Sequence, residues 1–188
     1  MLQIKTSLKQ LSNQLTDDDL TLLLQKWTHK RTLKRFEYLS LHGQVENMLY
    51  FINKGTFRTY ILNKGVEEAE EFGIPNRFYC SFVSFLTQQP ANNTLQALSK
   101  AEVIGINRAD FYDIILHNRK LERVWRHQIE YLLKERVERA LLLRSSSIEK
   151  VKRLLDSKAE IFQLIPYKYI ASYLDMSPST LSRVLKKL

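Results

Sequence analysis

The sequence predicts an α+β fold, in which an antiparallel β domain lies between helical segments and a helix-turn-helix occupies residues 166–188. Two observations indicate this fold. All five glycines fall between positions 43 and 105, among short aromatic and β-branched segments that alternate with turn residues. Apolar residues at helical spacing are confined to the parts of the chain before and after that region.

Residues 1–27 are expected to be helical. Thr16 precedes three aspartates at 17–19, so a capping hydroxyl and negative charges stand where a helix N-terminus favours both. Apolar residues then recur at helical spacing, at Leu20, Leu23, Leu24 and Trp27.

The β domain is expected to span about 75 residues from position 33. Asn-Lys-Gly occurs at 53–55 and again at 63–65, which predicts two turns. The acidic run 67–71 is interpreted as a solvated hairpin tip. The candidate strands are the segments 36–41, 48–52, 57–62, 78–82 and 101–106.

Helical spacing returns at Ala109, and Asn118 is placed to cap a longer helix over 119–143. Its apolar stripe is wide enough to pack on two partners, the β domain and a second copy of the chain. The stripe consists of Leu121, Trp125 and Leu132 together with Ile129, Leu133, Val137 and Leu141. We predict the seam of a homodimer at Leu121, Trp125, Gln128 and Leu132. Because Gln128 and Glu135 interrupt a strict heptad, the alternative is that the whole stripe belongs to the chain's own core.

Ser146 and Glu149 have the spacing of a capping box, which predicts the start of a further helix. Its inward side is expected to hold Ile148, Val151, Leu154 and Leu155.

The first helix of the predicted helix-turn-helix opens at Pro166, whose missing N–H would be unpaired at a helix start. Its apolar face is formed by Ile170, Ala171 and Leu174, and small Ala171 lets a second helix cross closely. Asp175 stands where the chain must turn, and aspartate tolerates the left-handed conformation.

The second helix starts with Ser177 as the N-cap and Pro178 at the first helical position. Leu181, Leu185 and Leu188 continue an apolar stripe. The alternative is an ordinary amphipathic hairpin with a solvated face. The side chains expected to face outward are Ser179, Thr180, Ser182, Arg183, Lys186 and Lys187.

Positive charge is concentrated near this segment. Residues 119–188 hold 16 basic and 8 acidic side chains, whereas residues 1–118 hold 13 basic and 12 acidic ones. A positive field confined to the part with the helix-turn-helix is typical of a protein that binds nucleic-acid phosphates.

Composition argues against several other classes. No apolar run approaches the ~20 residues of a membrane span, and no signal segment is expected. The single cysteine, Cys80, forbids an internal disulfide and fits a reducing cytoplasm. We expect no enzyme and no cofactor, because the chain has neither a Gly-rich phosphate loop nor a nucleophile elbow. The four histidines His29, His42, His117 and His127 lack paired-ligand spacing, so no metal site is expected, although haem held by one histidine stays open.

The order of these parts resembles the Crp/Fnr transcription regulators. The resemblance covers nearly the whole chain and rests on residues 50–58, Tyr-Phe-Ile-Asn-Lys-Gly-Thr-Phe-Arg, and on residues 170–183. It implies a β-roll like the cyclic-nucleotide-binding jelly roll, a central dimerisation helix and a winged-helix-like helix-turn-helix. The expected domains are residues 1–117, 118–143 and 144–188. The segment 156–165 looks too short for the family's usual wing.

The resemblance also implies roles for side chains. Ser179 and Arg183 match positions that face base edges in the family, while Pro178 replaces a residue able to read a base. Thr180 matches a phosphate contact, and Asp175 stands where the family usually has glycine. The expected contacts to double-stranded DNA are Tyr167, Lys168, Ser177, Ser179, Thr180, Ser182, Arg183, Lys186 and Lys187.

The effector pocket departs from the family pattern. Members that bind cyclic AMP need an arginine for the phosphate and a glutamate for the ribose, but the corresponding segment 78–99 has no charged residue. We therefore predict no response to cyclic AMP, and either another, unknown effector or none. This prediction would fail if an arginine from outside the segment, such as Arg58 or Arg77, reached the pocket and supplied the missing positive charge. The candidate pocket residues are Phe82, Val83, Asn92, Asn93 and Thr94.

The expected function is a homodimeric, sequence-specific transcription regulator, without membrane attachment. RNA polymerase is a further candidate partner, for the acidic run 67–71. The alternative function is a protein-interaction module that does not bind DNA and that carries a degenerate cyclic-nucleotide-binding fold.

Overall fold

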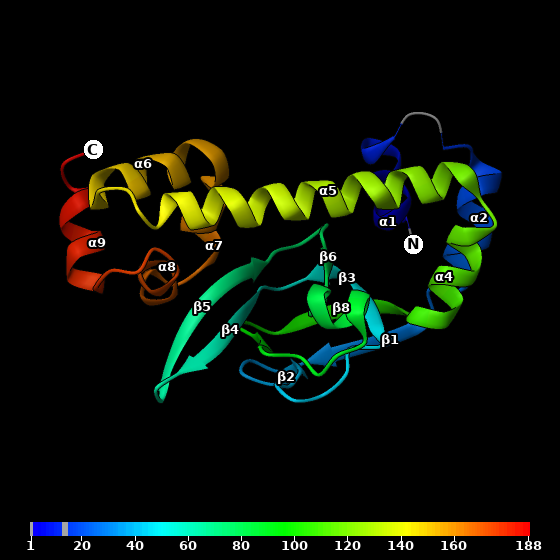
Figure 1. Cartoon of the computed structure of the whole chain (residues 1–188), viewed down its shortest axis with the longest axis horizontal. Coiled ribbons are helices and arrows are strands. Elements are labelled where there is room, and N and C mark those ends of the chain that lie inside the picture. The colour runs from blue at the N-terminus through cyan, green and yellow to red at the C-terminus, as the bar shows by residue number, and fades with distance from the viewer. Residues whose placement is uncertain (1, 13–14) are drawn as a thin grey trace.

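The computed structural model describes residues 2–12 and 15–188, and it has the predicted α+β fold (Figure 1). Two β-sheets with the N-terminal helices form one end, short helices form the other, and one long helix runs between them. The helices are α1 (Leu2–Leu11), α2 (Asp17–Gln25), α3 (Phe82–Thr87), α4 (Arg108–Leu116), α5 (Arg119–Leu142), α6 (Ser147–Lys158), α7 (Glu160–Leu164), α8 (Tyr167–Tyr173) and α9 (Pro178–Leu185). The strands are β1 (His29–Leu33), β2 (Tyr38–Ser40), β3 (Met48–Lys54), β4 (Phe57–Asn63), β5 (Val66–Gly73), β6 (Phe78–Tyr79), β7 (Thr94–Ala97) and β8 (Ala101–Asn107).

The two sheets are antiparallel and have four strands each. Their strand orders are β1-β8-β3-β6 and β2-β7-β4-β5, and Phe57, Tyr79 and Leu95 belong to the core between them. Both Asn-Lys-Gly turns are confirmed, since Gly55 and Gly65 adopt φ values of 83° and 82°. The sequence did not predict β1, β5 or β7, because their side chains do not alternate as half-buried strands do.

The N-terminal helices cover the outer side of the first sheet. The predicted cap of α2 at Thr16 is confirmed, and it belongs to a capping box: Thr16 accepts from the Asp19 N–H, and the Asp19 side chain accepts from the Thr16 N–H. Asn118 caps α5 as predicted, and its amide also bonds to Asp19. These bonds, Asn118 first, hold the pKa of Asp19 well below its usual range. Residues 1 and 13–14, part of the predicted helical segment, lie outside the described residues.

The long helix α5 packs one flank on the chain itself. Leu121 is 2% exposed, and the Trp125 ring lies 4.8 Å from the Phe111 ring. Leu132 and Gln128 are half-buried on the same flank. All four residues predicted for the dimer seam therefore lie on the flank that faces the chain's own β domain, and Leu121 is closed to any partner. The free apolar positions lie on the other flank, at Leu133, Val137 and Leu141.

The acidic run 67–71 is not a solvated hairpin tip, and this interpretation was wrong. The turn lies at Lys64 and Gly65, while the run forms the body of β5. Ala69 is 1% exposed, and Glu70 is half-buried. The cause is packing: helices α5 and α8 lie beside this edge strand and partly cover Glu70 and Glu71, whereas Glu67 stays exposed.

The C-terminal helices enclose a second core, which includes Val151, Leu154, Ile170 and Leu181. Ser146 caps α6 as predicted by accepting from the Glu149 N–H. Ile148 is 48% exposed, so its predicted inward position was wrong. Residues 156–165 form the end of α6 and the whole of α7, and this segment contains no β wing.

Comparing Gly55 with Gly65 measures the free-energy cost of adding a side chain where two backbone segments lie close together. Both have positive φ, but a Cβ at position 55 would lie 2.5 Å from the Lys100 carbonyl oxygen, whereas one at 65 meets nothing within 4 Å. Gly65→Ala should cost about 1 kcal/mol through its backbone conformation alone. Gly55→Ala should cost about 1–3 kcal/mol more through overlap. The midpoints of urea unfolding measure the difference in stability between the two variants, provided that the slope of unfolding free energy against urea is unchanged. Equal midpoints would contradict the close approach.

Candidate nucleic-acid interface

The turn between α8 and α9 is held by a complete Schellman motif. The Met176 N–H bonds to the Ala171 carbonyl at 3.0 Å, and the Asp175 N–H bonds to the Ser172 carbonyl at 3.1 Å. Asp175 occupies the left-handed position with φ 51°, as predicted for this aspartate. The turn therefore fixes the angle between the two helices by backbone bonds, even without glycine.

Ser177 fixes the start of α9. Its hydroxyl oxygen accepts from the Thr180 N–H at 3.1 Å, and Pro178 follows at the first helical position. Both predictions for this helix start are confirmed. The same hydroxyl lies within 2.9 Å of the hydroxyls of Ser179 and Thr180, so Ser177 is engaged inside the turn of the helix.

The two faces of α9 are separated. Leu181 is fully buried and Val184 is 6% exposed, whereas Leu188 is 56% exposed, so its place in the predicted stripe was wrong. Val184 was missed because the stripe was counted from Leu181 to Leu185 and Leu188, whereas the buried face also includes the residue three after Leu181. Thr180 is half-buried. The exposed side chains of this face are Ser179, Ser182, Arg183, Lys186 and Lys187.

The first helix adds Tyr167 and Lys168 to the exposed surface. Tyr167 is 49% exposed, and its ring lies 6.3 Å from the Phe162 ring. The Lys168 ammonium lies 4.6 Å from the centre of the Tyr169 ring, a cation–π contact that keeps its charge at the surface.

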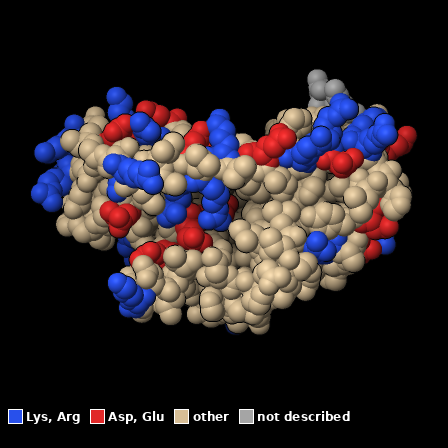
Figure 2. Space-filling model, viewed as in Figure 1, with Lys and Arg blue, Asp and Glu red and all other residues tan. Residues whose placement is uncertain are grey.

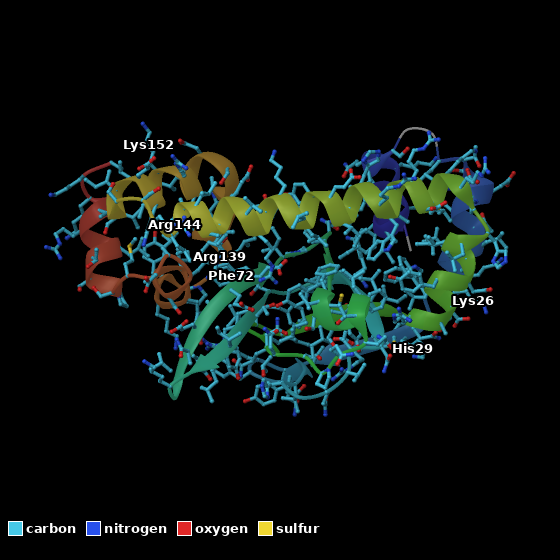
Figure 3. All side chains as sticks on the ribbon, in the orientation of Figure 1. Lys26, His29, Phe72, Arg139, Arg144 and Lys152 are labelled. Carbon is cyan, nitrogen blue, oxygen red and sulfur yellow. The ribbon has the colours of Figure 1, made fainter. Side chains whose placement is uncertain are left out.

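Positive charge gathers at this end of the molecule, over α6 and α9 (Figure 2). Lys152 on α6 points away from the body of the chain (Figure 3). In residues 2–12 and 15–188, none of Arg183, Lys186 and Lys187 forms an ion pair. These cations are therefore available to an anionic partner. A second basic group covers the N-terminal helices, at the far end of α5.

Sequence reasoning missed Lys150, which is 7% exposed. Its ammonium donates to the Leu174 carbonyl at 3.0 Å, at the last residue before the turn. A buried polar group needs such a hydrogen-bond partner, and this bond ties α6 to the turn. A lysine on the inward face of a predicted helix, one residue before Val151, is the signal that could have found it.

Comparison with known proteins agrees with this geometry. Residues 30–118 match the sequence family of the cyclic nucleotide-binding domain. FixK2 from Bradyrhizobium japonicum superposes with a TM-score of 0.72 at 18% identity, over 85% of this chain and 83% of that one. The catabolite activator protein of Thermus thermophilus gives a TM-score of 0.61 at 19% identity, over 95% and 85%. No curated protein matches the chain.

The chain has the Crp/Fnr fold, with a cyclic nucleotide-binding domain at residues 30–118. A third structure of this fold, the c-di-GMP responsive global regulator CLP of Xanthomonas campestris, superposes with a TM-score of 0.69 at 14% identity, over 92% of this chain and 91% of that one. The strands of the two sheets thus form the β-roll of a Crp/Fnr fold, and α8 and α9 form its helix-turn-helix.

The five residues predicted for a pocket in the β-roll lie in different surroundings. Phe82 belongs to the core under the N-terminal helices, and Val83 and Asn92 are exposed. Thr94 is buried and accepts from the His42 N–H. Asn93 is 3% exposed, accepts from the Ser81 hydroxyl at 2.8 Å and donates to a Glu70 carboxylate oxygen at 3.3 Å. Asn93 and Thr94 are thus hydrogen-bonded to other residues of the roll.

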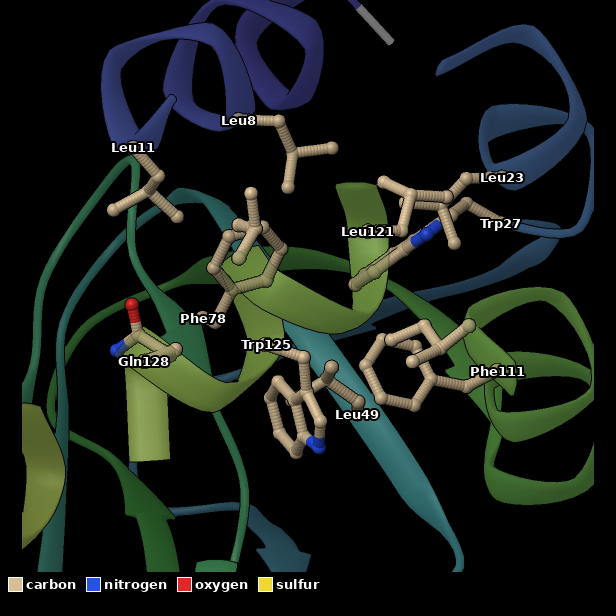
Figure 4. A pocket seen from close by; sticks show the side chains of 12 residues that line it. Leu8, Leu11, Leu23, Trp27, Leu49, Phe78, Phe111, Leu121, Trp125 and Gln128 are labelled. Atoms are coloured by element: carbon tan, nitrogen blue, oxygen red, sulfur yellow. The ribbon is translucent and has the colours of Figure 1, made fainter. Parts of the chain in front are cut away.

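Two cavities lie outside the roll interior. A groove of about 630 Å³ runs between α5 and strands β5 and β6, and Glu71, Arg136 and Tyr173 are among its walls. Burial raises the pKa of the Glu71 carboxyl, although Arg136 lies 3.8 Å away. A smaller, apolar cavity of about 30 Å³ lies under α1 and is lined by residues such as Leu8, Trp27 and Phe78 (Figure 4).

The described residues offer no other site chemistry. They hold no cluster of three metal-ligating side chains, and all four histidines lie at the surface. Cys80 is 2% exposed, and burial raises the pKa of its thiol, so it is an inert core residue. Within this part of the chain, every helix is too short or too polar to cross a membrane.

Proposed function

We propose that the chain is a sequence-specific, DNA-binding transcription regulator that acts as a homodimer and carries no catalytic site. The observation behind the proposal is the exposed face of α9, which follows a turn fixed by backbone bonds and on which Arg183, Lys186 and Lys187 form no ion pair with any described residue. A helix held in this way fits the major groove, with serines and one arginine toward the bases. The Crp/Fnr fold supports this reading.

The competing function is a docking module that binds a protein through the same face. The two functions predict a different dependence of binding affinity on salt. A DNA complex releases counterions from the phosphates, so its affinity falls steeply as salt rises. A protein complex of ordinary composition depends far less on salt.

Arg183 and Lys186 are predicted to act differently on DNA. Arg183→Ala should cost about 1–3 kcal/mol at one base pair per half-site and relax specificity there. Lys186→Ala should weaken binding to all sequences alike and reduce the slope of log affinity against log salt by about one per subunit. Anisotropy titrations at several salt concentrations measure both. Uniform weakening by Arg183→Ala would refute the base contact, and a salt-independent wild type would favour the docking module.

The homodimer is proposed on the free flank of α5. Leu133, Val137 and Leu141 are 65%, 52% and 53% exposed and continue from Ile129 at steps of four residues. Such a row forms a ridge that packs against the same ridge of a second helix. A second copy is the occupant that this geometry favours, because two-fold symmetry also pairs two recognition helices on one DNA site.

The seam is tested by Leu133→Glu with Val137→Glu. We expect the double variant to sediment at half the wild-type mass and to keep its helical circular dichroism, because both side chains are exposed in the single chain. Leu62→Glu, at a hairpin position that is 67% exposed, is the control and should leave the mass unchanged. A wild-type mass for the double variant would place the seam elsewhere. Glutamate at Trp125 would instead disrupt the chain's own core.

Cyclic AMP is predicted not to bind at physiological concentration. A phosphate beside Asn93 would face the Glu70 carboxylate, and the cation nearest to that carboxylate is Arg136, 3.8 Å away. Arg58 does not supply a positive charge for the phosphate, because its guanidinium already bonds to Gln96 and Glu67. An uncompensated buried phosphate costs several kcal/mol.

Calorimetry with cyclic AMP and cyclic GMP measures this directly. We expect no heat of binding, and a dissociation constant in the low micromolar range for either nucleotide would contradict the prediction. Asn92→Arg should not restore binding, since Asn92 is exposed and the ribose carboxylate is still missing.

A further inference from the structure

We propose that Arg58 and Ser172 are positioning residues, which fix the helix-turn-helix against the β4–β5 hairpin so that its orientation needs no bound effector. The inference rests on the proposed DNA-binding function. Neither residue lies on the exposed face of α9. Both lie where α8 meets the β-roll, on the side of α8 that packs against the β4–β5 hairpin.

The contact begins with the backbone of Ala69. Strand β5 is the edge of its sheet, so the outward groups of Ala69 have no neighbouring strand. The Ala69 N–H donates to the Ser172 hydroxyl at 3.0 Å, and the Ala69 carbonyl accepts from Arg139 at 2.9 Å. The Ser172 hydroxyl also donates to the Glu67 carbonyl at 3.4 Å. Helices α8 and α5 thus satisfy polar groups that the sheet leaves open.

Arg58 forms the second link. It is 6% exposed, and its guanidinium lies between two aromatic rings, 4.3 Å from the centre of Tyr60 and 4.5 Å from the centre of Tyr169. Its nitrogen atoms bond to Gln96 at 2.7 Å and to Glu67 at 2.6 Å. Tyr169 belongs to α8, whereas the other partners belong to the β-roll. A planar guanidinium stacks and bonds at the same time, which an ammonium group cannot do.

Tyr173 adds a third link at the other end of α8. Its ring lies 5.4 Å from the Phe72 ring and 4.8 Å from the Arg139 guanidinium. Phe72 and Arg139 lie side by side between β5 and α5 (Figure 3). The first helix of the motif is therefore fixed near its start by Tyr169 and at its end by Ser172 and Tyr173, which contact residues of the roll and of α5.

Strand β5 also connects this contact to the interior of the roll. Thr59 pairs with Glu71 and Tyr60 with Ala69, which leaves Glu70 as the extra residue of a bulge. Its carboxylate accepts from Asn93 at 3.3 Å and lies 3.8 Å from Arg136 of α5. The Glu70 side chain thus links the roll interior to α5, and the backbone of the neighbouring Ala69 links β5 to α8.

This arrangement predicts a specific defect. A dimer gains from its second half-site only if both recognition helices are already held at the right separation. Loosening α8 should therefore lower affinity for a site with two half-sites, while a single half-site is bound as before. A residue that touches DNA would instead weaken both sites.

The test compares Arg58→Lys and Ser172→Ala with matched controls, on DNA selected by the wild type. Arg35→Lys is the control for arginine, because the Arg35 guanidinium also stacks on a ring, that of Phe36, but in an exposed turn. Ser157→Ala is the control for serine, because its hydroxyl bonds only within α6. We expect about tenfold weaker binding to the two-half-site duplex for the two test variants and unchanged half-site binding. An unchanged ratio of full-site to half-site affinity would overturn the proposal.

Hydrogen exchange provides a readout that does not depend on DNA. Ser172→Ala removes the acceptor of the Ala69 N–H, so exchange at Ala69 should rise about tenfold while the amides paired between β4 and β5 stay protected. Unchanged exchange at Ala69 would overturn the contact. If the wild type bound no DNA, the proposed function would fail, and this measurement would still decide whether α8 is fixed to the hairpin.

Discussion

The arrangement of this molecule depends on the open edge of strand β5. An edge strand leaves backbone donors and acceptors without partners, and leaving them unpaired in a buried place costs free energy. Here Ser172 and Arg139 take both outward groups of Ala69. That one residue joins the β-roll, the central helix and the helix-turn-helix. The exposed face of α9 and the free flank of α5 are oriented relative to each other by this contact.

The same contact explains why an effector is unnecessary in the proposed mechanism. In a ligand-responsive protein, the ligand stabilises one of two conformations through interactions made in that conformation alone. In this chain the Glu70 carboxylate accepts from Asn93 inside the roll and lies 3.8 Å from Arg136 on α5. A side chain of the protein therefore connects the roll interior to the long helix. Arg58 is not free to bind an anionic ligand, since it is held by Gln96, Glu67 and two tyrosine rings.

Features fixed by neighbouring residues could be predicted from the sequence, and those fixed by distant packing could not. The caps at Thr16, Asn118 and Ser177 and the left-handed Asp175 follow from local chemistry, and all are confirmed. Strand β5 was missed because its acidic residues are drawn from solvent by helices far away in sequence. The stripe on α5 was identified, but spacing alone cannot say which flank the chain covers. The sequence around Arg58 gave no sign of its contacts with α8, because its partner Tyr169 lies far away in the chain.

The most direct test is selection of bound duplexes from a random DNA pool, with purified protein and no added nucleotide. The account predicts enrichment of an inverted repeat with half-site centres about one helical turn apart, since two equivalent recognition helices read it. The enrichment should be the same when cyclic AMP is added. No enrichment, enrichment of single half-sites alone, or a repeat that emerges only with cyclic AMP would contradict a dimeric regulator whose orientation is set by its own residues.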